Sequence, residues 1–333
     1  MTDPIDRALA GHALAADEAE AAFDRFMDGT ASHERMAALL MELRTRGERP
    51  SEVAGGVRAL AKAMVPLELS GDRIIDTCGT GGGSLTTFNI STAAAIVAVA
   101  AGARIAKHGN RSFTSLCGSA DVLEALGIPI GLDVAEERRF FEAHGFVFMF
   151  APAHHPAMRH VAAVRRELGV TTIMNLLGPL ANPARVRRQV VGVAHPESLR
   201  LVAESLRELG HERALVVHGE PGLDELSPVG PTRTLVLSDG EIEERTIHPS
   251  DFGWPEMSAT DLAGGEPAAN AAKVERVIRG DEGGGARAAV LLNAGAALWV
   301  AGVAGDMAEG VHLARDAIDH GRAGAKLDRL AGG

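Results

Sequence analysis

A glycine-rich stretch, Asp76-Thr77-Cys78-Gly79-Thr80-Gly81-Gly82-Gly83-Ser84, decides the fold of this 333-residue chain. It follows the short apolar segment Arg73–Asp76, a predicted strand, and precedes Ser91–Ala101, a predicted helix. Glycines allow positive φ and let an anion approach the backbone amides closely. The positive end of the following helix also favours an anion. The order of strand, loop and helix therefore predicts an anion site beyond the carboxyl end of a strand.

The spacing of these glycines excludes two common nucleotide motifs, because the loop is neither GxGxxG nor GxxxxGK[ST]. Taken alone, the loop could equally be a tight strand-to-helix connection. Asn89-Ile90-Ser91-Thr92, at the start of the next helix, could equally be a simple N-cap. By itself, the motif predicts an anion without saying which one.

The rest of the chain predicts an α/β fold with a small all-helical N-terminal lobe and a larger α/β domain around a mainly parallel central sheet. Residues 1–70 carry only helical periodicity and form the predicted lobe, to which we add helices from about 155–188; residues 71–333 form the α/β domain. Further strands are predicted at Arg104–Ala106, Phe146–Ala151, Val190–Val193 and Ala214–His218, a hairpin at Thr232–His248, and loops at Lys107–Gly118, Gly264–Ala272 and Gly283-Gly284-Gly285.

A basic polar segment, Lys107-His108-Gly109-Asn110-Arg111-Ser112, follows the second predicted strand. Lysine supplies a point charge and arginine a planar fork, which are the groups that phosphate recognition uses. The alternative is a solvated surface loop. Its position after a glycine loop of the same sheet favours phosphate binding.

Several long motifs, in this order along nearly the whole chain, resemble the successive signatures of anthranilate phosphoribosyltransferases. They are Asp76–Gly82, Thr87–Thr92, Lys107–Ser112, Gly118–Gly127, Thr172–Pro183 and Gly219–Ser227. The resemblance implies a nucleoside phosphorylase/phosphoribosyltransferase-like fold. It also implies transfer of phosphoribose from 5-phosphoribosyl 1-diphosphate to the amine of anthranilate, with release of diphosphate, in tryptophan biosynthesis. A homodimer joined through the helical lobe is implied as well.

The same resemblance implies a set of substrate-binding residues, in which Asn110 and Arg165 would contact anthranilate and Arg165 would pair with its carboxylate. His108 would bind or orient, and no catalytic residue is assigned. The full set is Gly79, Gly82, Gly83, Thr87, Asn89, Ser91, Thr92, Lys107, His108, Gly109, Asn110, Arg111, Ser112, Ser115, Ser119 and Arg165.

Magnesium is the expected cofactor, held by Asp224, Glu225 and Ser91. Adjacent carboxylates supply hard oxygen ligands, and Mg²⁺ takes the rest of its shell from water and substrate phosphate. By itself a Leu-Asp-Glu-Leu tetrapeptide is usually a solvated charge pair, and the family context favours the metal. His154 and His155 lack the partners of a metal site and are expected to be structural.

The sequence departs from the family's usual pattern near the phosphates. Gly83 stands where Asp is common, Ser84 where Gly is usual, Leu116 where Lys or Arg is frequent, and Cys117 where Ser is usual. Pro221 stands where Asp is frequent. The loss of a cation at 116 predicts weaker phosphate binding.

Composition narrows the alternatives. A formal net charge of −11 offers no general basic surface, so we expect no nucleic-acid partner. Two cysteines are too few for a disulfide framework and fit a cytoplasmic protein, and the apolar run Ala93–Ala101 is too short to span a membrane, so we expect no membrane association. A related pentosyltransferase with another acceptor, a nucleoside phosphorylase and a non-catalytic nucleic-acid-binding relative remain as alternatives.

Overall fold

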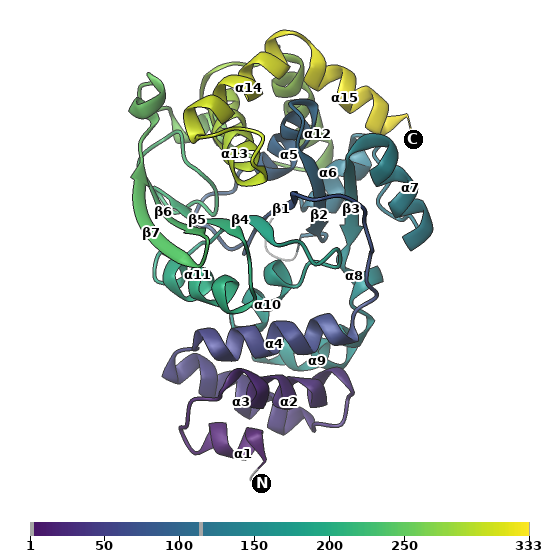
Figure 1. The fold of residues 1–333 in the computed structure, drawn as a ribbon, viewed down its shortest axis with the longest axis vertical. Helices are drawn as coiled ribbons and strands as arrows, with labels where there is room; N and C mark the ends of the chain where they lie inside the picture. The colour runs from purple at the N-terminus through teal and green to yellow at the C-terminus, as the bar shows by residue number, and fades with distance from the viewer. Residues whose placement is uncertain (1–2, 113–115, 333) are drawn as a thin grey trace.

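The structure, a computed structural model, describes residues 3–112 and 116–332. A helical lobe lies at one end of the elongated molecule and an α/β domain at the other, with the N-terminus at the tip of the lobe (Figure 1). The helices are α1 Pro4–Leu9, α2 Ala16–Met27, α3 His33–Arg46, α4 Pro50–Ala63, α5 Ile90–Ala100, α6 Ser119–Ala125, α7 Val134–His144, α8 Ala151–His154, α9 Arg159–Leu168, α10 Met174–Leu180, α11 Ser198–Glu208, α12 Pro267–Arg279, α13 Gly284–Ala301, α14 Met307–Asp319 and α15 Arg322–Ala331, with short 3-10 turns at Pro156–Met158, Pro249–Phe252 and Ala259–Leu262. The strands are β1 Ile74–Gly79, β2 Arg104–Gly109, β3 Phe146–Phe150, β4 Arg188–Gly192, β5 Arg213–Gly219, β6 Thr232–Ser238 and β7 Glu241–Ile247.

The central sheet has the order β3-β2-β1-β4-β5-β6-β7. The first five strands in this order are parallel, and β6 and β7 add an antiparallel edge hairpin. This confirms the predicted fold class. The chain winds outward from β1 to β3 and then returns to begin the other half at β4, so the topological switch point lies between β1 and β4. Ligands of open parallel sheets bind beyond the carboxyl ends of the strands at such a point.

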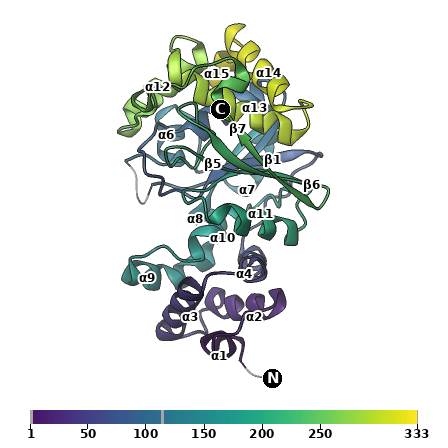
Figure 2. The ribbon, with the colours of Figure 1, turned by 90° about the vertical axis from the view of Figure 1, so that its left-hand side faces the viewer.

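Helices cover both faces of the sheet because successive side chains of a strand point to opposite faces. Val190, Leu215 and Val217 pack in one core with α5 and α13, whereas Val191 and Val216 pack in a second core with α11, α10 and the lobe. Figure 2 shows the lobe below the sheet, with α10 and α11 between them. The long helix α13 is apolar enough to cross a membrane, but 83% of it is buried inside the protein, as in a core helix.

The strand β2 is longer than predicted. Lys107, His108 and Gly109 continue it and pair with Phe148, Met149 and Phe150 of β3, so the polar loop begins at Asn110. The prediction failed because charged side chains were assigned to solvent. The Lys107 ammonium is buried, and it donates to the carbonyl and hydroxyl of Thr77. A buried cation that has such partners is compatible with a central strand.

Two predicted loops are helical. The segment predicted as a loop at 264–272 contains the start of α12, which begins at Pro267, because proline fits the first turn of a helix. The glycine run 283–285 contains the start of α13. There the amide of Gly285 donates to the Asp261 carboxylate at 2.9 Å, so this aspartate satisfies an amide of the first helical turn.

A buried histidine joins the segment after α4 to the α/β domain. The imidazole of His154 contacts the carbonyl of Val65 at 2.8 Å and the Glu137 carboxylate at 3.0 Å. Burial alone would lower the pKa of His154, but the bonds to Glu137 and Val65 outweigh it and raise the pKa above its ordinary value. The protonated form therefore stabilises the folded state.

We expect this stabilisation to be fully present below about pH 6.5, the ordinary pKa of histidine, and to be lost as the pH rises through the higher folded-state pKa. The difference in unfolding free energy between the unmodified protein and His154→Gln, from urea denaturation, should shrink between pH 6 and 8.5.

His211→Gln is the matched control. Burial lowers the pKa of His211 to about 4. The difference in unfolding free energy between the unmodified protein and His211→Gln should therefore grow as the pH rises towards 6.5. A His154→Gln difference that stays constant over the whole range would contradict the assigned ion pair.

Candidate active site

The glycine loop lies beyond the carboxyl end of β1, as predicted, and the strand order places this end at the switch point of the sheet. Gly79 ends β1 and is paired in register with Gly192 at the end of β4. The amide of Thr80 donates to the Gly192 carbonyl at 2.9 Å, and the Thr80 hydroxyl accepts from the amide of Ala194 at 3.2 Å. The two strand ends are thus fastened together directly below the loop.

Asp224 and Glu225 pack against this edge from the segment after β5. Asp224 accepts a hydrogen bond from the amide of Gly81 at 2.9 Å, and Glu225 accepts one from the amide of Ser91, in the first turn of α5, at 3.1 Å. A Cβ atom at Gly79 would lie 2.2 Å from the Asp224 carboxylate, and one at Gly192 would lie 1.6 Å from its carbonyl oxygen. Both positions therefore require glycine.

The charges of this cluster are strongly coupled. Burial, followed by the neighbouring charge of Asp224, raises the pKa of Glu225 to about 8, and Lys107 opposes the shift. The Lys107 ammonium also lies 3.3 Å from the hydroxyl of Ser91. Asp224 and Glu225 therefore repel each other, and an additional cation would relieve their repulsion.

The donor set of this cluster fits magnesium. In residues 3–112 and 116–332, no group of three or more His, Cys, Asp or Glu side chains could hold a metal ion alone. Two carboxylates and the Ser91 hydroxyl are hard oxygen donors, and Mg²⁺ usually completes its octahedron with water and substrate phosphate.

The start of α5 is not a simple cap. Asn89 occupies the N-cap position, but its side chain caps no amide of the helix. Its amide donates instead to the Cys117 carbonyl at 3.2 Å, and its oxygen accepts from Asn270 at 2.9 Å. The Thr92 side chain is buried, and its hydroxyl has no hydrogen-bond partner among the described residues. Thr87 lies in a short bridge with Ala263.

The predicted phosphate residues after β2 fall into two groups. Lys107 and His108 are buried in the strand, whereas Asn110 and Arg111 are exposed at its end. The Ser119 hydroxyl donates to the Asn110 carbonyl at 3.3 Å, and a Cβ atom at Gly109 would lie 2.3 Å from that hydroxyl. Ser112 is partly exposed in the same segment, while Ser115 lies outside the described residues.

His108 lies beside a second buried histidine. The ring centroids of His108 and His155 are 5.0 Å apart. Nε2 of His108 has no hydrogen-bond partner in the part of the chain that the structure describes. Burial, followed by the charge of His155, holds the pKa of His108 well below its ordinary value, so the ring is neutral.

Arg165 lies on α9 and is partly buried. Burial lowers its pKa, and it has no acidic partner within the described ranges. In Figure 2, α9 projects to the same side of the molecule as α6, which carries Ser119. A partly buried guanidinium without a carboxylate partner is suited to binding a carboxylate from a ligand.

Asn293 was not among the predicted site residues. This buried asparagine of α13 accepts from the amide of Leu226 at 3.0 Å and donates to the Leu226 carbonyl at 3.0 Å and to the Ala289 carbonyl at 2.9 Å. It thereby fixes the backbone next to Glu225, and both side chains line one small cavity. An amide inside an otherwise apolar, alanine-rich helix was the available signal.

Known proteins that resemble this chain match both of its parts. A family model described as "Glycosyl transferase family, helical bundle domain" matches residues 2–64, and one described as "Glycosyl transferase family, a/b domain" matches residues 71–324. The anthranilate phosphoribosyltransferase of Rubrobacter xylanophilus is 48% identical, over 99% of this chain and 96% of that protein. The chain belongs to the anthranilate phosphoribosyltransferase family. The enzyme of Thermomicrobium roseum is 49% identical, over 98% of this chain and 94% of that protein.

Solved structures of the family have the same fold. The anthranilate phosphoribosyltransferase of Thermus thermophilus is 43% identical and superposes with a TM-score of 0.94, covering 99% of both chains. The Saccharomyces cerevisiae enzyme in complex with PRPP and Mg is 26% identical with a TM-score of 0.89, covering 98% of this chain and 95% of that one. The resemblance read from the motifs is confirmed.

Positions 83, 84 and 221, at which the sequence analysis found departures from the usual pattern of the family, lie together in space. A Cβ atom at Gly83 would lie 2.9 Å from the Gly222 carbonyl oxygen, so a larger residue requires that segment to move. The Ser84 hydroxyl donates to the Pro221 carbonyl at 2.7 Å. The two loops are therefore packed against each other more closely than an aspartate at 83 would allow.

We expect Asn293→Leu to weaken magnesium binding. The substitution leaves the buried amide and carbonyl of Leu226 without partners, which costs about 1–3 kcal/mol. It also loosens Glu225, and loss of such an outer-shell partner typically lowers metal affinity ~10- to 100-fold. The magnesium dependence of turnover and urea denaturation measure the two effects.

Ser205→Ala is a matched control, because it removes one buried hydrogen bond, to the Leu201 carbonyl in α11. It should lower stability without changing the magnesium dependence. Equal magnesium dependence of Asn293→Leu and the unmodified enzyme would contradict the role of Asn293.

Proposed function

We propose that this protein transfers the phosphoribosyl group from 5-phosphoribosyl 1-diphosphate to the amine of anthranilate, giving N-(5-phosphoribosyl)anthranilate and diphosphate. The observation that carries the proposal is the partly buried pair Asp224 and Glu225, hydrogen-bonded to a glycine loop and a helix start at the switch point of the sheet. Family membership over the full length of the chain supports it. The reaction places the protein in tryptophan biosynthesis.

Residues of several elements surround the substrates in this proposal. Asp224, Glu225 and Ser91 would hold Mg²⁺, which supplies charge neutralisation for the departing diphosphate. Three parts of the chain surround the sugar diphosphate: the backbone of the glycine loop, the polar residues at the start of α5, and those of the segment after β2. These residues are Gly79, Gly82, Gly83, Thr87, Asn89, Ser91, Thr92, Lys107, His108, Gly109, Asn110, Arg111, Ser112, Ser115 and Ser119.

The chain contributes mainly position and charge. In the reaction, the bond from C1 to the diphosphate breaks towards an oxocarbenium-like centre. The Lys107 ammonium, which lies beside the hydroxyl of Ser91, contributes positive charge to this site. The rings of His108 and His155 are neutral, because burial lowers the pKa of both. The aromatic amine is already neutral at pH 7, so its attack requires no strong base. Positioning of both substrates then supplies much of the acceleration.

The organisation of the molecule is part of the proposal. We infer a helical domain over residues 1–70, joined by helices from about 155–188, and an α/β domain over residues 71–333. A homodimer through the helical lobe and a cytoplasmic location are further inferences, the first from the resemblance to the family and the second from the cysteine content. A pentosyltransferase with another acceptor and a nucleic-acid-binding relative gain no support from the relatives described above, and the charge of −11 disfavours the second.

The test of the reaction mixes the protein with Mg²⁺, anthranilate and 5-phosphoribosyl 1-diphosphate and follows anthranilate fluorescence. We expect a magnesium-dependent loss of signal. Asp224→Ala combined with Glu225→Ala should lower kcat/KM at least ~100-fold, because the metal ligands are gone. No fluorescence loss in the unmodified protein would refute the reaction, and normal rates of the double variant at limiting Mg²⁺ would refute the metal site.

Arg165 tests the acceptor. Arg165→Ala should raise the KM for anthranilate ~10- to 100-fold and leave the KM for 5-phosphoribosyl 1-diphosphate unchanged, because a hydrogen-bonded charge contributes about 1.5–3 kcal/mol. Arg166→Ala, an exposed neighbour on the same helix, is the control and should change neither constant. An effect of Arg165→Ala confined to the diphosphate substrate would contradict the assignment.

A further inference from the structure

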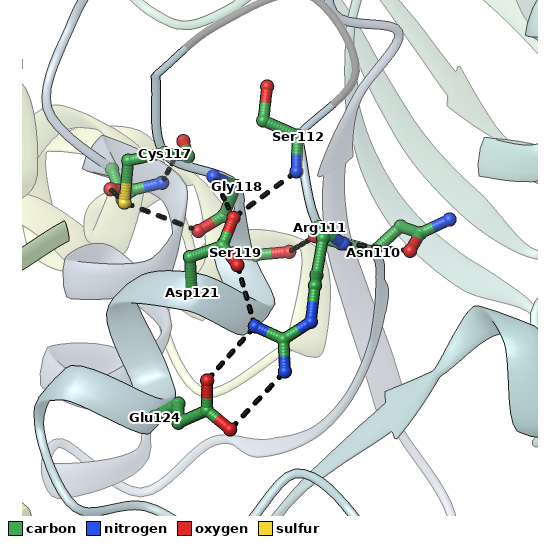
Figure 3. Close-up of polar contacts among 9 residues, drawn as sticks. Asn110, Arg111, Ser112, Cys117, Gly118, Ser119, Asp121 and Glu124 are labelled. Carbon is green, nitrogen blue, oxygen red and sulfur yellow. Dashed lines mark hydrogen bonds and ion pairs between the residues drawn. The ribbon is translucent and has the colours of Figure 1, made fainter. Parts of the chain in front are cut away.

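Asp121, on α6, accepts hydrogen bonds from three groups of the segments that flank it. One carboxylate oxygen accepts from the amide of Gly118 at 2.8 Å and from the amide of Ser112 at 3.3 Å. The other accepts from the guanidinium of Arg111 at 2.7 Å (Figure 3). One side chain therefore ties the chain that leaves β2 to the chain that enters α6.

Glu124, one turn further along α6, holds the same guanidinium. Its two oxygens accept from Nη1 and Nη2 of Arg111 at 2.9 and 3.2 Å, which is a bidentate pair (Figure 3). Both terminal nitrogens of Arg111 are thus engaged by carboxylates. Two acids surround one arginine, so the local charge is negative. A phosphate that approached this guanidinium would meet two carboxylates first.

The backbone shows the same close association. A Cβ atom at Gly118 would lie 2.4 Å from the amide nitrogen of Ser112 and 2.7 Å from the carbonyl oxygen of Asn110. The amide of Ala120 donates to that carbonyl at 3.2 Å. The segments 110–112 and 118–120 therefore lie in direct contact, and Arg111, Asp121 and Glu124 fasten them from the outside.

We propose that Asp121 and Glu124 are positioning residues for the sugar-diphosphate site, and that Arg111 acts through them, by holding segments 110–112 and 118–120 together, instead of bonding to phosphate through its guanidinium. This inference rests on the proposed function, because that function makes these segments part of the diphosphate site. Because the amides of Arg111, Ser112, Gly118 and Ala120 already donate within the protein, the binding groups are then the short side chains that the ion pairs hold in place.

A double-mutant cycle of Arg111→Gln and Glu124→Gln tests the proposal. Each single variant should raise the KM for 5-phosphoribosyl 1-diphosphate ~3- to 30-fold, and the double variant should be no worse than the worse single one, because both remove the same contact. The KM for anthranilate should change little. Glu124 is largely exposed, so its replacement is compatible with folding, which the urea midpoint verifies.

Direct binding of phosphate by Arg111 predicts a different change in KM for Glu124→Gln. If the guanidinium binds phosphate directly, Arg111→Gln alone raises the KM, whereas Glu124→Gln releases the guanidinium and lowers the KM or leaves it unchanged. Either result would overturn the proposal. Arg200→Gln and Glu204→Gln, which break an exposed ion pair on α11, are the matched controls and should leave both constants unchanged.

Calorimetric measurement of 5-phosphoribosyl 1-diphosphate binding in the presence of Mg²⁺ tests the positioning role of Asp121 and Glu124 separately from the proposed reaction. Binding without turnover in the unmodified protein would count against the proposed reaction. The Kd values of the same double-mutant cycle would then still test the positioning role. Turnover with additive effects of the two substitutions would refute the positioning role alone. Coupled losses in both Kd and KM would support it.

Discussion

Two adjacent carboxylates, Asp224 and Glu225, are packed against the carboxyl ends of β1 and β4, and their charges must be compensated there. An ionised group removed from water costs several kcal/mol unless hydrogen bonds and opposite charges compensate it. The amides of Gly81 and Ser91 and the ammonium of Lys107 supply part of this compensation. Much of the surrounding structure follows from that requirement.

This need for charge compensation also affects the strands of the sheet. Lys107 can sit in a central strand only because the Thr77 carbonyl and the Ser91 hydroxyl accept its hydrogen bonds. Beside it, burial raises the pKa of Asp76 to about 6, and Asn182 and the amide of His108 donate to this carboxylate. A connected polar layer thus runs through the middle of an otherwise apolar core. Such a layer is costly if any member is missing, so the fold and the site are specified together.

The sequence predicted the parts of the site whose signals are local. The glycine loop, the start of α5 and the alternation of strands and helices could be inferred because glycine spacing and periodicity act over a few residues. The extent of β2 could not, because the burial of Lys107 depends on Thr77, thirty residues earlier. The partners of Asn293 and His155 could not be inferred either, although the amide of Asn293 in an alanine-rich helix was a visible signal. Their roles come from contacts with Leu226 and His108 that only the closed sheet creates.

Two arginines show how far residue type determines function. Arg111 and Arg165 were both predicted to bind an anion of the substrates, and both carry the same fork of donors. Arg111 already has its anions, since Asp121 and Glu124 come from the adjacent helix. Arg165 lacks an acidic partner in the described chain, and burial disfavours its charge. A guanidinium that is partly desolvated and uncompensated gains most from a ligand carboxylate, whereas one that is already paired must first lose its partners. The difference between the two lies in their neighbours, and on that basis we propose substrate recognition for Arg165 and a positioning role for Arg111.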